Sequence, residues 1–186
     1  MRSYFLEDKI MTNERNAYDA IDVANYVILK SKVFNDKITN LKLQKVLYFL
    51  QAAFLTEVHK SLIKEPFERW SYGPVVPEVY KFFRKFGSNQ IKTPVSSYTI
   101  DITKGFEVTE EPFDQSVISD EDKRLIDKFY EPMAPYTAGR LVDLTHKQES
   151  WKKYTTNGKL NSDKIPPYSD KEIVESINEN DEFKIW

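Results

Sequence analysis

The chain has 186 residues, of which 40% are hydrophobic and 30% charged, and its formal net charge is -2. This composition suits a globular domain and excludes a membrane helix, which needs a run of about 20 apolar residues. Cysteine is absent, which excludes disulfides, thiolate catalysis and cysteine-based zinc sites.

The beginning of the chain leads to two predictions, one about domain organisation and one about location. Residues 1–16 show no apolar periodicity, so we expect an N-terminal extension followed by one domain over residues 17–186. No charged leader with an apolar run opens the chain, which predicts a cytoplasmic protein that is neither secreted nor membrane-bound.

The first two helices are predicted from apolar residues at helical spacing. Residues 17–30 carry one apolar stripe, and the segment "TNLKLQKVLYFLQAAFLTEVHK" carries a much broader one. Such a broad stripe is typical of a helix that is buried on most sides, and we call it the central helix. Its polar residues Lys42, Lys45 and Gln51 are predicted to occupy the remaining, open face.

The stretch "FERWSYGPVVPEVYKFFRKFG" forms what we call the aromatic corner. A short strand is expected over residues 67–71, followed by a stiff bend, because Gly73 tolerates any φ and Pro74 fixes the next one. A helix is then predicted to begin at Pro77 and to end at Gly87.

A β-hairpin is predicted after the corner. Residues 98–108 alternate between apolar and polar around Lys104-Gly105, which favours a turn.

Capping boxes predict where two later helices begin. Ser119 with Asp122 precedes one apolar stripe, and Ser169 with Glu172 precedes another. The remaining elements are a short helix over residues 137–146 and a loop over residues 154–168. We therefore predict a mainly α fold: a single helical domain around the buried central helix, with a small antiparallel β-hairpin.

The sequence offers no complete catalytic, metal or phosphate site. Of its two histidines, His59 is expected at the surface, and His146 is either a general base or, as we favour, a buried residue that hydrogen-bonds its neighbours. The acidic clusters 119–123 and 178–182 lack the spacing and the glycine of a calcium loop. We predict a protein that is not an enzyme and that uses no cofactor or metal.

A basic middle segment raises the question of nucleic acid. Residues 30–92 contain 12 Lys and Arg against 5 Asp and Glu, which leaves 15 against 24 for the rest. This asymmetry suits either an acidic partner or mutual neutralisation across the fold. The pI of about 5.8 disfavours nucleic acid as the ligand of the basic residues near the aromatics, which are Lys42, Lys45, Lys81, Arg84 and Lys85.

Three sequence blocks carry a family resemblance. The first lies on the central helix and contains Leu41, Leu43, Gln44, Lys45, Leu47 and Tyr48. The second is the aromatic corner, with Trp70, Tyr72, Gly73, Pro74, Val75, Val76, Pro77 and Tyr80. The third is "LVDLTHKQESW", with Leu144, Thr145, His146 and Trp151, where Ser150 stands at the position of the family's usual proline. Together the blocks resemble the SocA-like, phage GepA-related family, also described as the Panacea antitoxin domain.

The resemblance implies a non-enzymatic antitoxin that neutralises a cognate protein toxin by direct contact. Two alternatives stay open: an adaptor that delivers the toxin to a protease, as one founding member of the family does, and a phage-encoded binding protein without a toxin partner. The oligomeric state is not predicted.

We expect the partner to bind at the aromatic corner, because a rigid aromatic surface loses little entropy on association. The predicted partner-binding residues are Trp70, Tyr72, Gly73, Pro74, Val75, Pro77, Tyr80, Lys81 and Arg84. The family-motif residues with an expected structural role are Leu43, Gln44, Lys45, Tyr48, His146 and Trp151.

Overall fold

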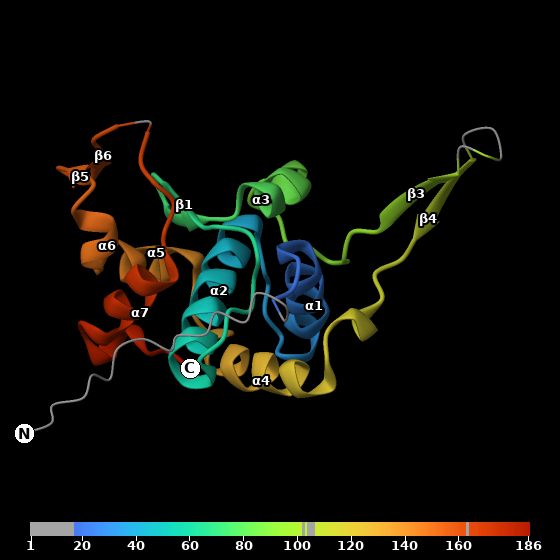
Figure 1. Cartoon of the computed structure of the whole chain (residues 1–186), viewed down its shortest axis with the longest axis horizontal. Coiled ribbons are helices and arrows are strands. Elements are labelled where there is room, and N and C mark those ends of the chain that lie inside the picture. Colours follow the sequence, from blue (N-terminus) through green and yellow to red (C-terminus); the bar gives the residue numbers. More distant parts are fainter. Residues whose placement is uncertain (1–16, 102, 104–106, 163) are drawn as a thin grey trace, which may run out of the picture.

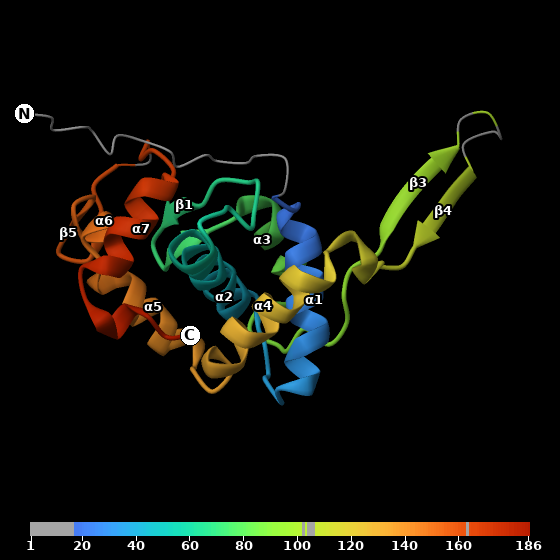
Figure 2. The ribbon, with the colours of Figure 1, turned by 60° about the horizontal axis from the view of Figure 1, so that its bottom comes forward.

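One central helix, α2, organises the chain, and the other helices pack around it. The computed structural model describes residues 17–101, 103, 107–162 and 164–186. The helices are α1 (Ala20–Val33), α2 (Asn40–Ala53, continued by the π-helical turn Phe54–Val58), α3 (Pro77–Phe83), α4 (Asp120–Tyr130), α5 (Ala138–Lys147), α6 (Glu149–Lys152) and α7 (Asp170–Asn178). Figures 1 and 2 place α1 and α4 on one side of α2, and α5, α6 and α7 on the other. The predicted mainly helical fold around a buried central helix is confirmed.

Helix α2 is buried along almost its whole length. It begins after Thr39, whose hydroxyl accepts a hydrogen bond from the Lys42 amide at 3.3 Å. Within its bounds, Leu41 is the residue that is not buried. A helix this enclosed must bury its polar side chains as well as its apolar ones.

The prediction that Lys42, Lys45 and Gln51 occupy an open face is therefore wrong. They are only 5%, 0% and 2% exposed. Each side chain bonds to the backbone of a loop that covers this face; Lys45 Nζ, for example, donates to the Pro74 carbonyl at 2.7 Å. Covering loops bring buried backbone groups that need partners, and these polar side chains supply them.

Small antiparallel sheets of two strands each join the helices. The pairs are β1 (Glu68–Trp70) with β2 (Gly73–Val75), β3 (Ser97–Asp101) with β4 (Glu107–Glu111), and β5 (Thr155–Thr156) with β6 (Lys159–Leu160). The β3–β4 hairpin projects from the helical body (Figure 1). Its strands confirm the predicted hairpin, while the turn predicted at Lys104-Gly105 lies outside the described residues.

The predicted loop over residues 154–168 contains the β5–β6 pair, so that prediction is wrong in part. Its turn consists of Asn157 and Gly158, with φ angles of 50° and 73°. Asn-Gly is the pair that a tight hairpin turn with two positive φ angles favours, so the signal was present in the sequence.

Several helix ends follow the predicted local rules. Helix α3 begins at Pro77, and after the 3-10 turn Arg84–Phe86 the chain turns at Gly87 with φ 54°. Helix α7 has the complete predicted capping box of Ser169 and Glu172. Further 3-10 turns are Gln115–Val117, Glu131–Met133 and Asp181–Phe183.

The capping box predicted for α4 is only half formed. Ser119 Oγ accepts a hydrogen bond from the Asp122 amide at 3.1 Å. The Asp122 carboxylate instead binds the Tyr18 hydroxyl and Lys60 Nζ, both at 2.6 Å. This acid therefore ties α4 to the segment before α1 and to the loop after α2.

Among the described residues, no helix is both long and apolar enough to cross a membrane. The predicted extension over residues 1–16 lies outside the described residues. The division into this extension and a single domain over residues 17–186 stays a prediction.

Candidate partner-binding site

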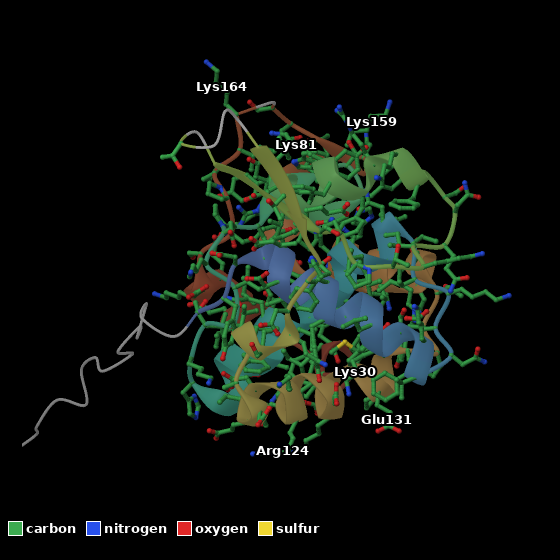
Figure 3. All side chains as sticks on the ribbon, turned by 90° about the vertical axis from the view of Figure 1, so that its right-hand side faces the viewer. Lys30, Lys81, Arg124, Glu131, Lys159 and Lys164 are labelled. Carbon is green, nitrogen blue, oxygen red and sulfur yellow. The ribbon has the colours of Figure 1, made fainter. Side chains whose placement is uncertain are left out.

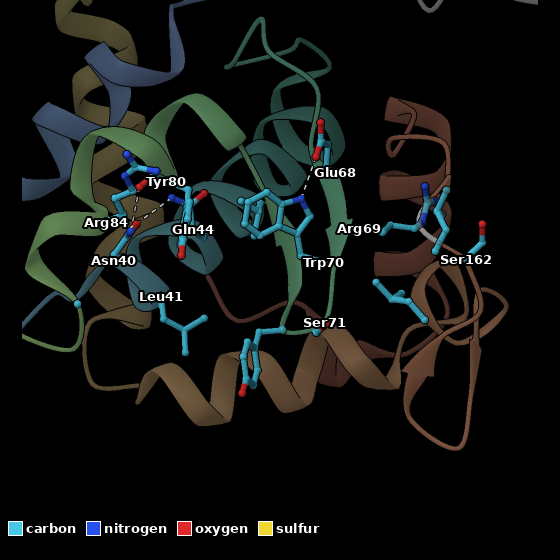
Figure 4. Close-up of a pocket in the computed structure, with 15 residues that line it drawn as sticks. Asn40, Leu41, Gln44, Glu68, Arg69, Trp70, Ser71, Tyr80, Arg84 and Ser162 are labelled. Atoms are coloured by element: carbon cyan, nitrogen blue, oxygen red, sulfur yellow. Dashed lines mark hydrogen bonds between the residues drawn. The ribbon is translucent and has the colours of Figure 1, made fainter.

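The aromatic corner borders a large groove. The groove has a volume of about 670 Å³ and lies between the β1–β2 turn, the start of α2, α3 and the segment around residues 160–165 (Figure 4). Its lining residues come from four separate parts of the sequence: Asn40, Leu41 and Gln44; Glu68 to Tyr72 and Val75; Tyr80, Arg84 and Gly87; and Leu160, Ser162 and Ile165.

Three aromatic side chains form the accessible rim of this groove. Tyr72 is 65% exposed and Tyr80 is 37% exposed, while Trp70 is half-buried. The Trp70 and Tyr80 rings meet edge to face with centroids 5.0 Å apart, and Trp70 Nε1 donates to Glu68 at 2.8 Å. We call Trp70, Tyr72 and Tyr80 the aromatic rim.

The Gly-Pro bend lies beneath the rim and is buried. Gly73, Pro74 and Val75 expose almost none of their surface. Gly73 has a φ of 87°, and a Cβ there would lie 2.4 Å from Thr145 Oγ1. Only glycine fits this position, because both the backbone conformation and the space exclude a side chain.

Polar side chains of α2 hold the corner from below. Gln44 Oε1 accepts the Val76 amide at 3.0 Å, and Gln44 Nε2 donates to Asn40 at 3.2 Å. Asn40 Nδ2 in turn donates to the Tyr80 carbonyl at 3.1 Å (Figure 4). This chain links the bend to α3, so the two sides of the rim share one support.

Lys45 makes another contact between α2 and the bend. Its Nζ donates to the Pro74 carbonyl at 2.7 Å, and the residue is completely buried. Burial lowers the pKa of Lys45 to about 7.

The third sequence block packs against the same bend. The His146 and Trp151 rings stack with centroids 3.7 Å apart, and Trp151 Nε1 donates to the Trp70 carbonyl at 3.3 Å. Burial, and then the charge of Lys45, lower the pKa of His146. His146 Nε2 is buried without a hydrogen-bond partner among the described residues. A neutral histidine stacked on tryptophan is part of the packing under the rim.

Arg69 fixes the opposite wall of the groove, and the sequence analysis missed it. Its guanidinium lies between the rings of Tyr154 and Tyr168, at 4.5 and 3.9 Å from their centroids. It also donates to the Ser150 carbonyl at 2.9 Å and to Glu172 at 2.8 Å, and bonds the Pro166 carbonyl. All of these partners are at least 81 residues away in sequence, so no local sequence pattern predicts these contacts.

Tyr48, the last motif residue of the first block, connects α2 to the same wall. Its hydroxyl donates to Gln148 at 2.7 Å, and its ring contacts those of Phe67 and Tyr168. Leu43 lies in the hydrophobic core. The three sequence blocks thus converge around one buried bend.

The predicted partner-binding residues divide into a rim and a base. Trp70, Tyr72, Tyr80, Lys81 and Arg84 present surface to solvent, Pro77 is half-buried at the start of α3, and Gly73, Pro74 and Val75 lie underneath. Figure 3 shows Lys81 together with Lys159 and Lys164 on one side of the molecule, opposite Arg124 and Glu131. Their contact with a partner stays a prediction.

The groove lining combines aromatic, amide, hydroxyl and charged side chains. Among the described residues, no three His, Cys, Asp or Glu side chains are grouped so that they could hold a metal ion. The Glu68 carboxylate, which lines the groove, accepts the hydrogen bond from Trp70 Nε1. His146, for which we favour a structural role over that of a general base, stacks on Trp151 beneath the rim and is not among the residues that line the groove.

Comparisons with known proteins agree with the three-block signature. The family model described as "Antitoxin SocA-like, Panacea domain" matches residues 43–152. The protein named Antitoxin SocA from Caulobacter vibrioides (strain NA1000 / CB15N) is 31% identical over 137 residues, which cover 73% of this chain and 69% of that protein. No solved structure matches the chain significantly.

Proposed function

Because the chain belongs to the SocA-like antitoxin family with a Panacea domain, we propose that it neutralises a cognate protein toxin by binding it directly at the aromatic rim. The supporting observation is an accessible aromatic rim on a bend that α2 and α5 hold rigidly. Tryptophan and tyrosine are frequent anchors at protein interfaces, and a fixed support reduces the entropy lost on binding. We place this activity in the cytoplasm.

The exposed cations beside the rim complete the proposed surface. Lys81 and Arg84 lie one turn apart on α3 and the 3-10 turn that follows it, and Arg84 lines the groove. Exposed charges at the border of an interface mainly steer the encounter and exclude wrong partners. We therefore assign affinity to the aromatic rim and association rate to these two cations.

A co-expression experiment tests the proposal. The product of the neighbouring gene is expressed with the wild-type protein or with the double variant Tyr72→Ala/Tyr80→Ala, and growth and co-purification are measured. We expect the wild type to restore growth and the double variant to fail, with Kd weakened about 30-fold or more. A neighbouring product that is neither toxic nor bound by the wild type would refute the proposal.

Phe82→Ala is the matched control. Phe82 lies on the same helix and is 45% exposed, but it lines a separate cleft on the side of α1 and the β3–β4 hairpin. It should leave growth rescue intact. Loss of rescue with Phe82→Ala alone would place the partner on the other side of α3.

The amount of toxin separates direct neutralisation from the adaptor alternative. Direct neutralisation predicts a stable complex in which the toxin level is unchanged. A toxin level that falls only when both proteins are present would instead support delivery to a protease.

A further inference from the structure

Lys45 is an unusual residue for the centre of a folded domain. It is completely buried, and its Nζ has the Pro74 carbonyl as hydrogen-bond acceptor at 2.7 Å. Within the described part of the chain, no carboxylate forms an ion pair with it. Lys42, three residues earlier, is also buried but pairs with Asp36 at 2.6 Å.

A buried amine without a counter-charge disfavours the folded state. Either the ammonium is held in a medium of low polarity, or the group gives up its proton, and both are unfavourable relative to water. The lowered pKa near 7 agrees with this environment. A methionine would fill the same elongated space without this penalty, and it would leave the Pro74 carbonyl without its lysine donor.

The bond from Lys45 acts on the part of the chain that sets the rim. Pro74 lies between Tyr72 and Tyr80, and β1 and β2 contribute only three residues each. Gly73 approaches Lys45 so closely that an added Cβ would lie 3.4 Å from its Cε. The position of the carbonyl held by Lys45 therefore determines where the bend rests on α2.

We infer that Lys45 is a positioning residue that holds the Gly73-Pro74 bend and aligns the aromatic rim for its partner, at the expense of the stability of the fold. The inference rests on the proposed function for its second half, the link to partner binding. Its first half, the hold on the bend, concerns the free protein and is measurable without any partner.

The test compares two buried lysines of the same helix, Lys45→Met and Lys42→Met. For each variant we measure Tm, amide hydrogen exchange of residues 71–80, and Kd for the product of the neighbouring gene. Lys45→Met should raise Tm by about 2–4 °C or more, yet exchange in the bend should be about tenfold faster and Kd about tenfold weaker.

Lys42→Met should show the opposite pattern. It leaves Asp36 buried without its cation, so Tm should fall by about 6 °C or more. Exchange in the bend, relative to the global rate, and Kd of the folded protein should stay at wild-type values, because Lys42 contacts Asp36 and Ala134 rather than the bend.

Two results would overturn the inference. One is a Lys45→Met variant whose bend exchanges as slowly as the wild type. The other is a Lys45→Met variant that unfolds or loses Tm like Lys42→Met, since Lys45 would then be an ordinary stabilising residue. If the wild type does not bind the neighbouring product, the proposed function fails, while hydrogen exchange still decides the role of Lys45.

Discussion

The surroundings of Lys42 and Lys45 differ although the two residues lie one turn apart on α2. Around Lys42, Asp36 accepts from both the ammonium and the Tyr130 hydroxyl, at 2.6 and 2.7 Å, so charge and hydrogen bonds are matched. Around Lys45, the neutral Pro74 carbonyl accepts the hydrogen bond from Nζ. Lys42 therefore stabilises the fold, whereas we infer that Lys45 positions the bend beneath the aromatic rim.

The largest expected effect on stability comes from breaking the buried ion pair between Lys42 and Asp36. Asp36→Asn keeps the shape of the side chain but leaves the Lys42 ammonium buried without a counter-charge. We expect the free energy of unfolding, measured in urea, to fall by about 3–5 kcal/mol.

Asp127→Asn is the control for that experiment. Asp127 pairs with Lys30 at 2.6 Å, but both side chains are more than a quarter exposed. Its loss should lower the free energy of unfolding by about 1 kcal/mol or less. Equal losses for the two variants would show that burial does not distinguish them.

The next largest effect comes from forcing the bend away from Lys45. Gly73→Ala places a methyl group against Thr145 at a φ that alanine disfavours, so we expect a loss of about 2–4 kcal/mol in the free energy of unfolding. Gly139→Ala is the matched change, because a Cβ at Gly139 meets no atom within 4 Å. It should be neutral or slightly stabilising, and a similar loss at both positions would contradict the role of the bend.

The pH dependence of Lys45→Met sharpens the comparison. The pKa of Lys45 is lowered from 10.5 to about 7 in the folded state, so between pH 7 and 10 the unfolded chain binds more protons at this site. Wild-type stability should therefore rise with pH relative to Lys45→Met, by up to about 1.4 kcal/mol per pH unit.

Urea unfolding of both proteins at pH 7, 8 and 9 measures this difference. The advantage of Lys45→Met should be greatest at pH 7 and should shrink toward pH 9. His146 contributes little to this difference above pH 7, because burial lowers its pKa from 6.5 and this cause is the same in both proteins. A difference that is constant with pH would show that Lys45 titrates normally.

The smallest effects on stability are expected at exposed cations, because their surroundings resemble neither those of Lys42 nor those of Lys45. Lys81→Glu and Arg124→Glu reverse charges on opposite sides of the molecule (Figure 3). Both should leave Tm within about 2 °C of wild type, while only Lys81→Glu should slow association with the neighbouring product, several-fold and less so at high salt. Equal rates for the two variants would remove Lys81 from the proposed surface.

Much of the fold follows from local sequence rules. Pro77, Gly87 and the Ser169–Glu172 box set helix ends through contacts within a few residues, so the chain displays them directly. The Asn157-Gly158 turn follows the same kind of rule, and its hairpin was predictable.

The support of the site was less predictable, because it depends on distant backbone groups. From its position on α2 alone, Lys45 would be assigned to the surface. It is buried because the loop that contains Pro74, 29 positions later, covers this face, and its Nζ donates to the Pro74 carbonyl. Arg69 likewise acquires its role from Ser150 and Glu172. Sequence periodicity gives the face of a helix on which a polar residue lies, but not whether a loop will cover that face.

The three tryptophans of the chain stand in three different environments. Trp70 lies at the half-buried rim, Trp151 is stacked on His146, and Trp186 packs edge to face on Phe129 with ring centroids 6.5 Å apart. Replacing the last two with phenylalanine leaves one tryptophan, located where an occupant of the groove would displace water from the indole. The molecule thus carries its own optical reporter, and no dye is needed to follow the groove in solution.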